Sequence, residues 1–251
     1  MIDSHCHLDF EAFDHDREAV IKCALENGVH NIIVPAVSAN TFNRTIKVCR
    51  QHQELHLALG LHPIFTEQHQ PQDLLTLDKY VNQHQPIAIG EIGLDYFDQQ
   101  ADKEKQAAFF TKQLIIAKQH ALPVIIHNRK AHDQCINLLK EIEPSGGIIH
   151  AFNGSIQQAQ KYIELGFLLG FGGMLTFERS TKLKSLARQI PLSSIALETD
   201  APDMTVAQHR GERNSPAYLP FIRSALSTIK KTSLSEVSDV TSSNIRRVFQ
   251  L

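Results

Sequence analysis

The sequence alternates short apolar runs with longer amphipathic stretches, and this alternation restricts the fold more than any other feature. The apolar runs are rich in Val, Ile and Leu and cover residues 1–3, 31–37, 55–60, 86–90, 123–127, 146–150, 167–172 and 194–198. Such runs are typical of strands that are buried on both faces of a parallel sheet. Strands that alternate with helices in this way predict a parallel β/α architecture.

The stretches between the apolar runs carry start and stop signals of helices. Helical patterns cover residues 16–28, 103–120, 133–142, 155–166, 216–231 and the tail from Ser235. Gly28 and Gly166 stand where the C-terminal end of a helix favours glycine, and Ser155 stands at an N-cap position. We therefore expect helices to connect consecutive strands.

The length of the chain distinguishes between the folds that this alternation allows. With 251 residues, the chain matches the typical size of one (β/α)8 barrel. No linker rich in Pro, Gly or Ser divides it. We expect an α/β fold with a single TIM-type barrel, regular or distorted, that spans residues 1–251 as one domain and packs its C-terminal helices on the outside. An open doubly wound sheet is the alternative fold.

Charge and cysteine content limit the class of protein. The net charge is −2, so the chain lacks the global basic field of proteins that bind long nucleic acids. Its four cysteines are scattered without a Cys-x-x-Cys pair, which favours free thiols in a reducing compartment. The sequence has neither a signal peptide pattern nor an apolar run of membrane length. We expect a cytoplasmic protein with no membrane contact and, by default, a monomer.

Ligand-type residues stand near the start of the chain and after later apolar runs. In a strand, His5 and His7 would point to the same side while Cys6 packs into the core. Residues of similar chemistry follow other runs: His62, Glu91, Asp95, His127, His150, Glu198 and Asp200. The carboxyl ends of the strands meet at one face of a barrel, where barrel enzymes build their active sites. These residues are therefore expected to converge.

The combination of residue types predicts a metal site. Glu91 and Asp200 emerge from buried strands, where an unpaired carboxylate is costly or becomes protonated, and a divalent cation removes that cost. Imidazole and carboxylate ligands suit zinc, manganese or iron, and suit magnesium less well. The set is too large for one tetrahedral ion. Two divalent ions with a bridging carboxylate would use all of it and favour hydrolysis, especially of phosphate esters.

Isolated histidines carry much less information than this set. A single histidine after an apolar run, such as His127 or His150, is more often a hydrogen-bonded core residue, so the prediction depends on the whole group. Other histidines lie in Gln-rich or helix-end contexts, and we expect them to be solvated: His52, His56, His69, His84 and His120.

The chain resembles the TatD-type metal-dependent deoxyribonucleases, which belong among the amidohydrolase-like barrels. The blocks that carry the resemblance span nearly the whole chain: DSHCHLD (3–9), LGLHP (59–63), GEIGLDY (90–96), PVIIHNR (123–129), HAFNGS (150–155), GFGGMLTF (170–177), ETDAP (198–202), RGERNSP (210–216) and TSSNIRRVF (241–249). Together they are highly specific, although none is decisive alone. The resemblance implies a barrel fold and a deoxyribonuclease activity.

The resemblance also implies a ligand set for each ion. The first ion would be held by His5, His7, Glu91 and Asp200. The second would be held by Glu91, His127 and His150. Glu91 would bridge the two ions, so no carbamylated lysine is expected. The metal could be zinc, manganese or magnesium.

Further roles follow from the same resemblance. Asp200 would orient or deprotonate the attacking water, and Glu91 would support catalysis as the bridge. His62 is a weaker catalytic candidate that would contact the scissile phosphate, donate a proton or only cap a loop. Asp95 and Glu198 would orient ligand histidines, with a structural role equally open.

Candidate substrate contacts come from basic and aromatic residues near the strand ends. The phosphate-binding candidates are Arg129, Arg210, Arg213 and Asn214. The aromatic candidates are Tyr96, Phe97, Phe152 and Phe177, which would stack on bases or, slightly more often, pack loops. Without a basic track, we expect local binding of DNA or a short nucleic acid through strand ends, single strands or short fragments.

Two other functions stay open from the sequence. The same dinuclear site could hydrolyse another ester or amide bond, such as the aminoacyl ester of a tRNA or a cyclic amide. A protein of a different class would bind metal without catalysis, although the complete ligand set argues against it. Assays with DNA and aminoacyl-tRNA distinguish the first two.

Overall fold

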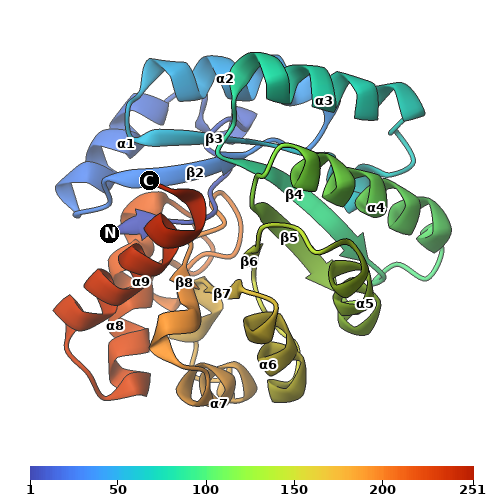
Figure 1. Cartoon of the computed structure of the whole chain (residues 1–251). Coiled ribbons are helices and arrows are strands. Elements are labelled where there is room, and N and C mark those ends of the chain that lie inside the picture. Colours follow the sequence, from blue (N-terminus) through green and yellow to red (C-terminus); the bar gives the residue numbers. More distant parts are fainter.

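Eight parallel strands lie in one sheet in the order of the sequence (Figure 1). A computed structural model describes residues 1–251. The strands are β1 (Ile2–Asp3), β2 (Asn31–Pro35), β3 (Leu55–Leu59), β4 (Ala88–Asp95), β5 (Val124–Arg129), β6 (Gly147–Ile149), β7 (Phe167–Phe171) and β8 (Ile195–Leu197). The predicted (β/α)8 barrel is confirmed, and the open doubly wound sheet is excluded because strand order never reverses.

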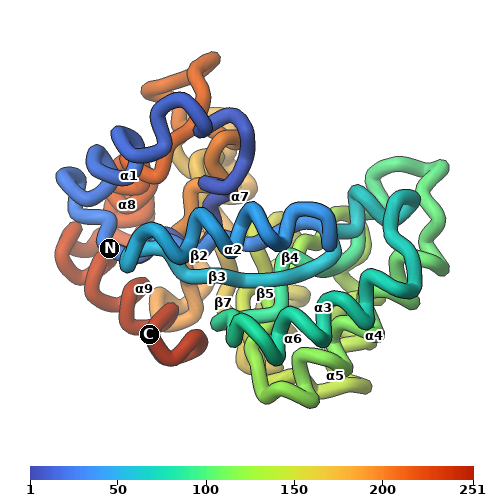
Figure 2. Tube along the Cα trace, turned by 90° about the horizontal axis from the view of Figure 1, so that it is seen from above, coloured from blue at the N-terminus to red at the C-terminus, as the bar shows by residue number.

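Helices follow the strands and surround the sheet (Figures 1 and 2). They are α1 (Arg17–Glu26), α2 (Phe42–Gln51), α3 (Pro71–His84), α4 (Lys103–Gln119), α5 (His132–Ile142), α6 (Ile156–Glu164), α7 (Thr181–Gln189), α8 (Leu219–Lys230) and α9 (Leu234–Phe249). The predicted cap at Ser155 is present, since its side chain accepts a hydrogen bond from the Gln158 amide. Helices α2, α3 and α7 come in addition to the predicted ones.

The interior of the barrel is filled by one small or branched residue from each strand. This cluster contains Ile2, Ile33, Ala58, Ala88, Ile125, Ile148, Leu168 and Ala196, together with Ile245 and Phe249 of α9. Because side chains alternate along a strand, the other face of the sheet packs against the helices, in a larger cluster of 55 buried residues. Helix α9 therefore also packs against the side chains that fill the interior of the barrel.

The barrel closes between β1 and β8 without a regular ladder. Strand β1 has only two residues, so His5 and His7 lie after the strand and not within it, contrary to expectation. Backbone bonds still join the two segments: the Asp200 amide donates to the His5 carbonyl (2.9 Å), and the His7 amide donates to the Ala201 carbonyl (2.8 Å). This closure brings the first histidines beside Asp200. Cys6 is fully buried in the core, as predicted.

Strand β4 runs further than its apolar run indicates. It continues to Asp95, so Glu91 lies inside the strand and does not follow it, and the pairing with β5 shifts register between Ile89 and Ile92. Gly60, just after β3, allows the close approach, because a Cβ there would lie 2.6 Å from the Gly90 carbonyl carbon. The shift in register allows Glu91, which lies in the middle of β4, to place its side chain in the site.

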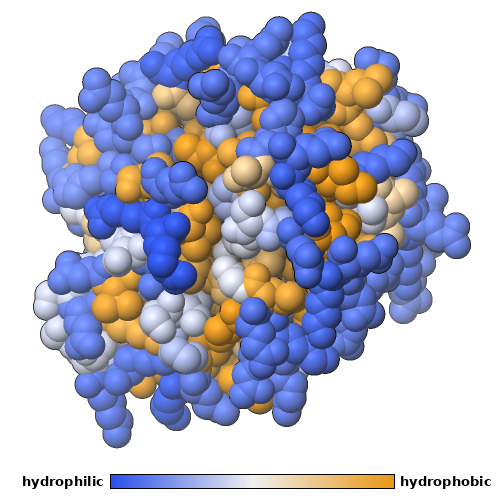
Figure 3. Space-filling model, viewed as in Figure 1, coloured by the Kyte–Doolittle hydropathy of each residue, from blue (hydrophilic) through white to orange (hydrophobic).

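The two termini lie on the same side of the molecule in both views (Figures 1 and 2). Hydrophilic side chains cover most of the face in Figure 3, with smaller hydrophobic patches between them. None of the helices has the length and apolar character needed to cross a bilayer. All four cysteines are free, as expected.

Candidate metal centre

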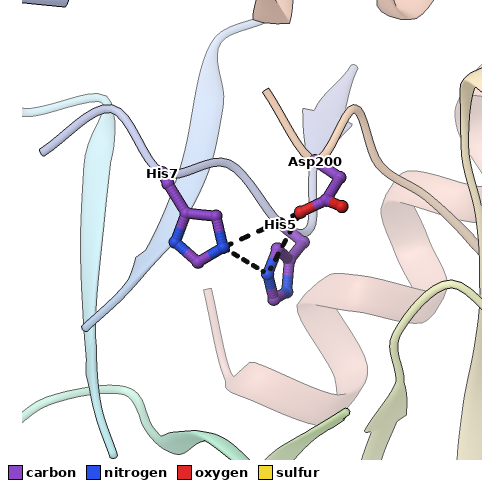
Figure 4. A group of neighbouring side chains, drawn as sticks. All are labelled: His5, His7 and Asp200. Carbon is purple, nitrogen blue, oxygen red and sulfur yellow. Dashed lines mark hydrogen bonds and ion pairs between the residues drawn. The ribbon is translucent and has the colours of Figure 1, made fainter. Parts of the chain in front are cut away.

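Four side chains from three parts of the chain bring one ligand atom each to the same place. His5 Nε2 lies 3.2 Å from His7 Nε2, 3.1 Å from Glu91 Oε2 and 3.7 Å from Asp200 Oδ1. His7 Nε2 lies 3.5 Å from the same Glu91 oxygen and 3.7 Å from the same Asp200 oxygen. Figure 4 shows His5, His7 and Asp200 pointing toward one another.

These spacings fit a metal ion. The ligand atoms of His5, His7 and Asp200 lie 3.2–3.7 Å from one another, so one ion could lie about 2.0–2.2 Å from all three, which is the range of bonds from zinc to nitrogen and oxygen. The protons are also placed suitably. His7 Nδ1 lies 3.2 Å from the Pro35 carbonyl, so Nδ1 carries a hydrogen, and loss of the Nε2 proton would leave the Nε2 lone pair for an ion.

The second oxygen of Glu91 faces a different pair of histidines. Glu91 Oε1 lies 3.2 Å from His62 Nε2 and 3.2 Å from His127 Nδ1. His127 Nε2 lies 2.9 Å from Asp95 Oδ2. Asp95 therefore accepts the Nε2 hydrogen of His127 and fixes the ring with Nδ1 toward Glu91.

His150 completes the group from the side of β6. Its ring stacks on His5 with centroids 3.7 Å apart, and its Nε2 lies 3.5 Å from Asp200 Oδ2. On the opposite side of the ring, Nδ1 lies 3.1 Å from Glu198 Oε1. Glu198 Oε1 also accepts a hydrogen bond from the Ala151 amide at 2.6 Å. Glu198 therefore lies beside His150 and is held by the backbone that follows it.

The histidines of the cluster balance the negative charges of Glu91 and Asp200. Burial opposes ionisation of Glu91, but the charges of His62 and His5 and hydrogen bonds from the surrounding rings hold its pKa well below the usual range. Burial opposes ionisation of Asp200 too, and His150 together with His5 and other rings lowers its pKa to about 2. Both carboxylates are anionic, which is the state that binds a divalent cation.

The histidines divide into two kinds. Burial lowers the pKa of His5, and it lowers the pKa of His62 to about 4. Burial also acts on His150 and His7, but neighbouring carboxylates outweigh it: Glu198 and Asp200 raise the pKa of His150 well above its usual value, and Glu91 raises that of His7 to about 9. Cation binding would replace the protons that now neutralise the cluster.

The structure brings together all six residues that the sequence singled out as ligands. Their candidate atoms form three overlapping groups, with all atoms of a group within 4.8 Å of one another: His5, His7 and Asp200; His5, Glu91 and His150; and His62, Glu91 and His127. One difference from the expected arrangement concerns His62. It stands with Glu91 and His127, where the resemblance implied His150.

The cluster forms the floor of a cavity of about 550 Å³. Apolar residues contribute much of its wall, including Phe10, Ile64, Phe65, Phe171, Met174, Leu183 and Met204. Arg129 is the one lysine or arginine in the lining. Its guanidinium carbon lies 3.5 Å from the centroid of Phe97, an exposed ring.

Three of the expected phosphate contacts lie elsewhere. Asn214 is fully buried and donates to the Thr199 and Asp203 carbonyls, so the expected substrate contact is wrong for this residue, which instead pins the loop after β8. Arg213 places both terminal nitrogens on Asp16, at 2.9 and 2.6 Å, and does not line the cavity. Arg210 is exposed and also lies outside the lining.

Two other expectations change with the structure. His69 was expected to be solvated, but it is buried, and its Nε2–H donates to the His62 carbonyl at 3.0 Å, which supports the loop after β3. The other four histidines of that group keep partial exposure. Of the aromatic candidates, Phe152 lines the cavity although it is almost fully buried, and Phe97 is the exposed one.

Sequence reasoning missed several polar residues of the cavity. Asn128, Asn153 and Asp203 all line it. Each stands within a few residues of a predicted ligand, in HNR, HAFNGS or after ETDAP. Their position at the carboxyl ends of the strands or just after them was the available signal.

A barrel with histidines and carboxylates gathered at one mouth is an arrangement suited to metal-dependent hydrolysis. The family model described as TatD related DNase matches residues 2–250, so the chain belongs to the TatD family.

Relatives agree with this assignment over their full length. The metal-dependent hydrolase YjjV of Escherichia coli K12 is 37% identical, with 100% of this chain and 98% of the relative covered. YabD of Bacillus subtilis, also described as a metal-dependent hydrolase, is 33% identical, with coverage of 100% and 99%. The crystal structure of E. coli YjjV, a TatD homologue, superposes with a TM-score of 0.96 and covers 100% of this chain and 98% of that one.

Metal removal should lower the stability of the protein. An ion that binds only the folded state at 100 times its Kd adds about 2.7 kcal/mol, which corresponds to a rise in Tm of about 5–10 °C for a domain of this size. We expect this rise when zinc or manganese is added to chelator-treated protein in a thermal unfolding experiment. An unchanged Tm at saturating metal would contradict the ion-binding role of the cluster.

Gly170→Ala should weaken the centre through Glu198. A Cβ at Gly170 would lie 2.3 Å from Glu198 Oε2, so the carboxylate must move away from His150. We expect a loss of about 1–3 kcal/mol in the free energy of unfolding and about 10–100-fold weaker metal binding, measured by urea denaturation and metal titration. Gly172→Ala is the control, because its Cβ would meet only the Glu198 carbonyl, at 3.3 Å, and the Glu198 Cγ, at 3.7 Å. Equal effects in both variants would contradict the role of Glu198.

Proposed function

We propose that the chain hydrolyses phosphodiester bonds of DNA, acting on strand ends, single strands or short fragments. The observation that carries the proposal is the position of Glu91. Its Oε2 faces His5 and His7, while its Oε1 faces His62 and His127. A carboxylate shared between two groups of imidazoles suits a two-ion site, and such sites favour hydrolysis of phosphate esters. The family description, TatD related DNase, supports the same reaction.

Two divalent ions are part of this proposal. His5, His7, Glu91 and Asp200 would hold the first, and Glu91, His127 and His150 the second. The number of imidazoles favours zinc or manganese over magnesium. When bound, the ions supply Lewis acidity at the scissile phosphate.

Asp200 would accept the proton of the attacking water. Its side chain is 15% exposed and lines the cavity, whereas Glu91 is 2% exposed and surrounded by histidines. Of the two carboxylates in the ligand cluster, Asp200 is therefore the one that a water in the cavity reaches more easily.

His62 would act as a hydrogen donor and not as a metal ligand. The Ile64 amide donates to His62 Nδ1 at 3.1 Å, so this nitrogen uses its lone pair there. With its pKa lowered to about 4, the ring is neutral and carries its one hydrogen on Nε2. A protonated Nε2 cannot ligate an ion, but it can donate to a phosphoryl or leaving-group oxygen.

Arg129 would bind one phosphate of the substrate. Phe97 supports its guanidinium from one side, and Arg129 is the one lysine or arginine that lines the cavity. Because few phosphates are neutralised, binding should depend weakly on salt, with a slope of about −1 to −2 in a plot of log affinity against log salt concentration. A slope several times steeper would indicate an extended binding track and contradict this substrate class.

The test is a metal-dependence series on chemically defined substrates. Chelator-treated protein is restored with zinc, manganese or magnesium and assayed on single-stranded DNA with a blocked 3′ or 5′ end, on duplex DNA and on aminoacyl-tRNA. We expect metal-dependent cleavage of the single strand and of ends. Deacylation of the tRNA without any DNA cleavage would overturn the nuclease function and leave a metal-dependent hydrolase of another ester.

A further inference from the structure

A chain of polar side chains leads from the buried side of α5 and α6 to the cavity. The two helices lie side by side (Figures 1 and 2). Tyr162 on α6 is fully buried, His132 begins α5, and Asn153 lies between β6 and α6 and lines the cavity. His132 Nδ1 lies 3.1 Å from the Tyr162 hydroxyl oxygen, and His132 Nε2 lies 3.2 Å from Asn153 Oδ1. None of these residues belongs to the metal centre.

The Ala151 carbonyl determines the direction of each hydrogen bond in this chain. Asn153 Nδ2 donates to the Ala151 carbonyl at 3.2 Å, so Asn153 Oδ1 faces His132 as an acceptor. His132 Nε2 must then carry a hydrogen. Burial lowers the pKa of His132, so the ring is neutral and its Nδ1 keeps a lone pair. This lone pair faces the Tyr162 hydroxyl at 3.1 Å, and the His132 carbonyl is a second acceptor for the same hydroxyl at 3.3 Å.

The last group of this chain is a hydrogen donor at the cavity. Asn153 Nδ2 has two hydrogens, and the Ala151 carbonyl accepts only one of them. The side chain is exposed, lines the cavity and follows His150 by three residues. Reversal of the amide would place two acceptors, Asn153 Oδ1 and the Ala151 carbonyl oxygen, against each other. The amide is therefore locked with its nitrogen as the available group.

We propose that Asn153 is a substrate-binding residue whose free amide N–H donates to a phosphate oxygen, and that His132 and Tyr162 are positioning residues that lock its orientation. The inference rests on the proposed phosphodiesterase function and adds a neutral donor to the single cation, Arg129. A phosphate oxygen accepts such a donor, whereas an ammonium group of a substrate has no lone pair and would not.

Kinetics of single and double variants test the contact. Asn153→Ala should raise KM for single-stranded DNA about tenfold, with kcat nearly unchanged. This is the loss of affinity expected when one hydrogen bond to a charged group is removed. Asn153→Asp should raise KM further, because a carboxylate repels the phosphate. His132→Leu should act like Asn153→Ala, and the double variant should be no worse than either single one. His132→Gln should restore KM, because its amide nitrogen can donate to Asn153 Oδ1.

Two further measurements test the inference without relying on enzyme turnover. In the zinc-loaded protein, nitrogen-15 spectra of the histidines should assign the hydrogen of His132 to Nε2, and Tyr162→Phe should disturb this assignment without loss of bound zinc. Inorganic phosphate, used as the probe in calorimetry, should bind about tenfold more weakly to Asn153→Ala than to the unchanged protein.

The outcomes separate this inference from the proposed function. DNA cleavage with the same KM in Asn153→Ala would overturn the inference and leave the nuclease function standing. If the protein cleaves no DNA but Asn153→Ala weakens its binding of phosphate, the inference is supported and the nuclease function is overturned. A hydrogen on His132 Nδ1, or equal phosphate affinity in both proteins, would overturn the inference.

Discussion

Glu91→Ala is expected to abolish turnover, with a loss of at least about 10³-fold in kcat, or about 4 kcal/mol of transition-state stabilisation. Each of its two oxygens lies within 3.5 Å of two histidine nitrogens, so the substitution removes the shared member of both ligand groups. Bound metal should fall from two ions to one or none. The measurement is steady-state cleavage of DNA together with metal content by mass spectrometry.

The barrel should stay folded in Glu91→Ala, since the change removes a buried carboxylate and adds no bulk. Circular dichroism would verify this. Glu141→Ala is the matched control, because Glu141 is an exposed carboxylate on α5 without side-chain partners, and it should keep full activity and metal content. Normal turnover by Glu91→Ala would contradict the proposed mechanism.

Asp200→Asn is expected to lower kcat by about 10²–10⁴-fold, the range that a general base contributes. The amide keeps the size of the side chain but cannot accept the proton of water. His5, His7 and Glu91 remain, so at least one ion should still bind, which separates this variant from Glu91→Ala. Parallel measurements of kcat and metal content report the two effects.

The control for Asp200→Asn is Asp203→Asn, because Asp203 also lines the cavity and is exposed but belongs to none of the candidate ligand groups. It should retain kcat within about threefold, as expected of a residue outside the reacting centre. If Asp203→Asn were the inactive variant and Asp200→Asn the active one, the assignment of the base would have to be reversed.

The fold was predictable from the sequence because strand burial leaves a local signal. A parallel barrel buries both faces of each strand, and this produces the continuous Val, Ile and Leu runs. Helix α3 shows where the signal fails: its sequence PQDLLTLDKYVNQH buries only Leu74, Leu77 and Val81, a stripe too narrow to stand out from its polar residues. The extension of β4 past Gly90 also left no apolar signal, since Glu91 lies within it.

The site was predictable in residue type and place, but not in its finer contacts. The ligand candidates were recognisable because a carboxylate on a buried strand requires a partner. The roles of Asn214 and Arg213 depend on how the loops pack. Asn214 binds the Thr199 carbonyl, a backbone group that leaves no pattern in the sequence. Arg213 binds Asp16, which is distant in the sequence. The hydrogen bond from the Ile64 amide to His62 Nδ1 likewise depends on backbone geometry, which the sequence does not reveal.

The most direct test of the account is an anomalous-scattering experiment on crystals grown with zinc. The account predicts two peaks about 3.5–4 Å apart, the spacing of two-ion sites, on either side of the Glu91 carboxylate, with His62 in contact with neither ion. One peak alone, or peaks bound away from Glu91, would contradict the claim that this carboxylate joins two cations at the mouth of the barrel.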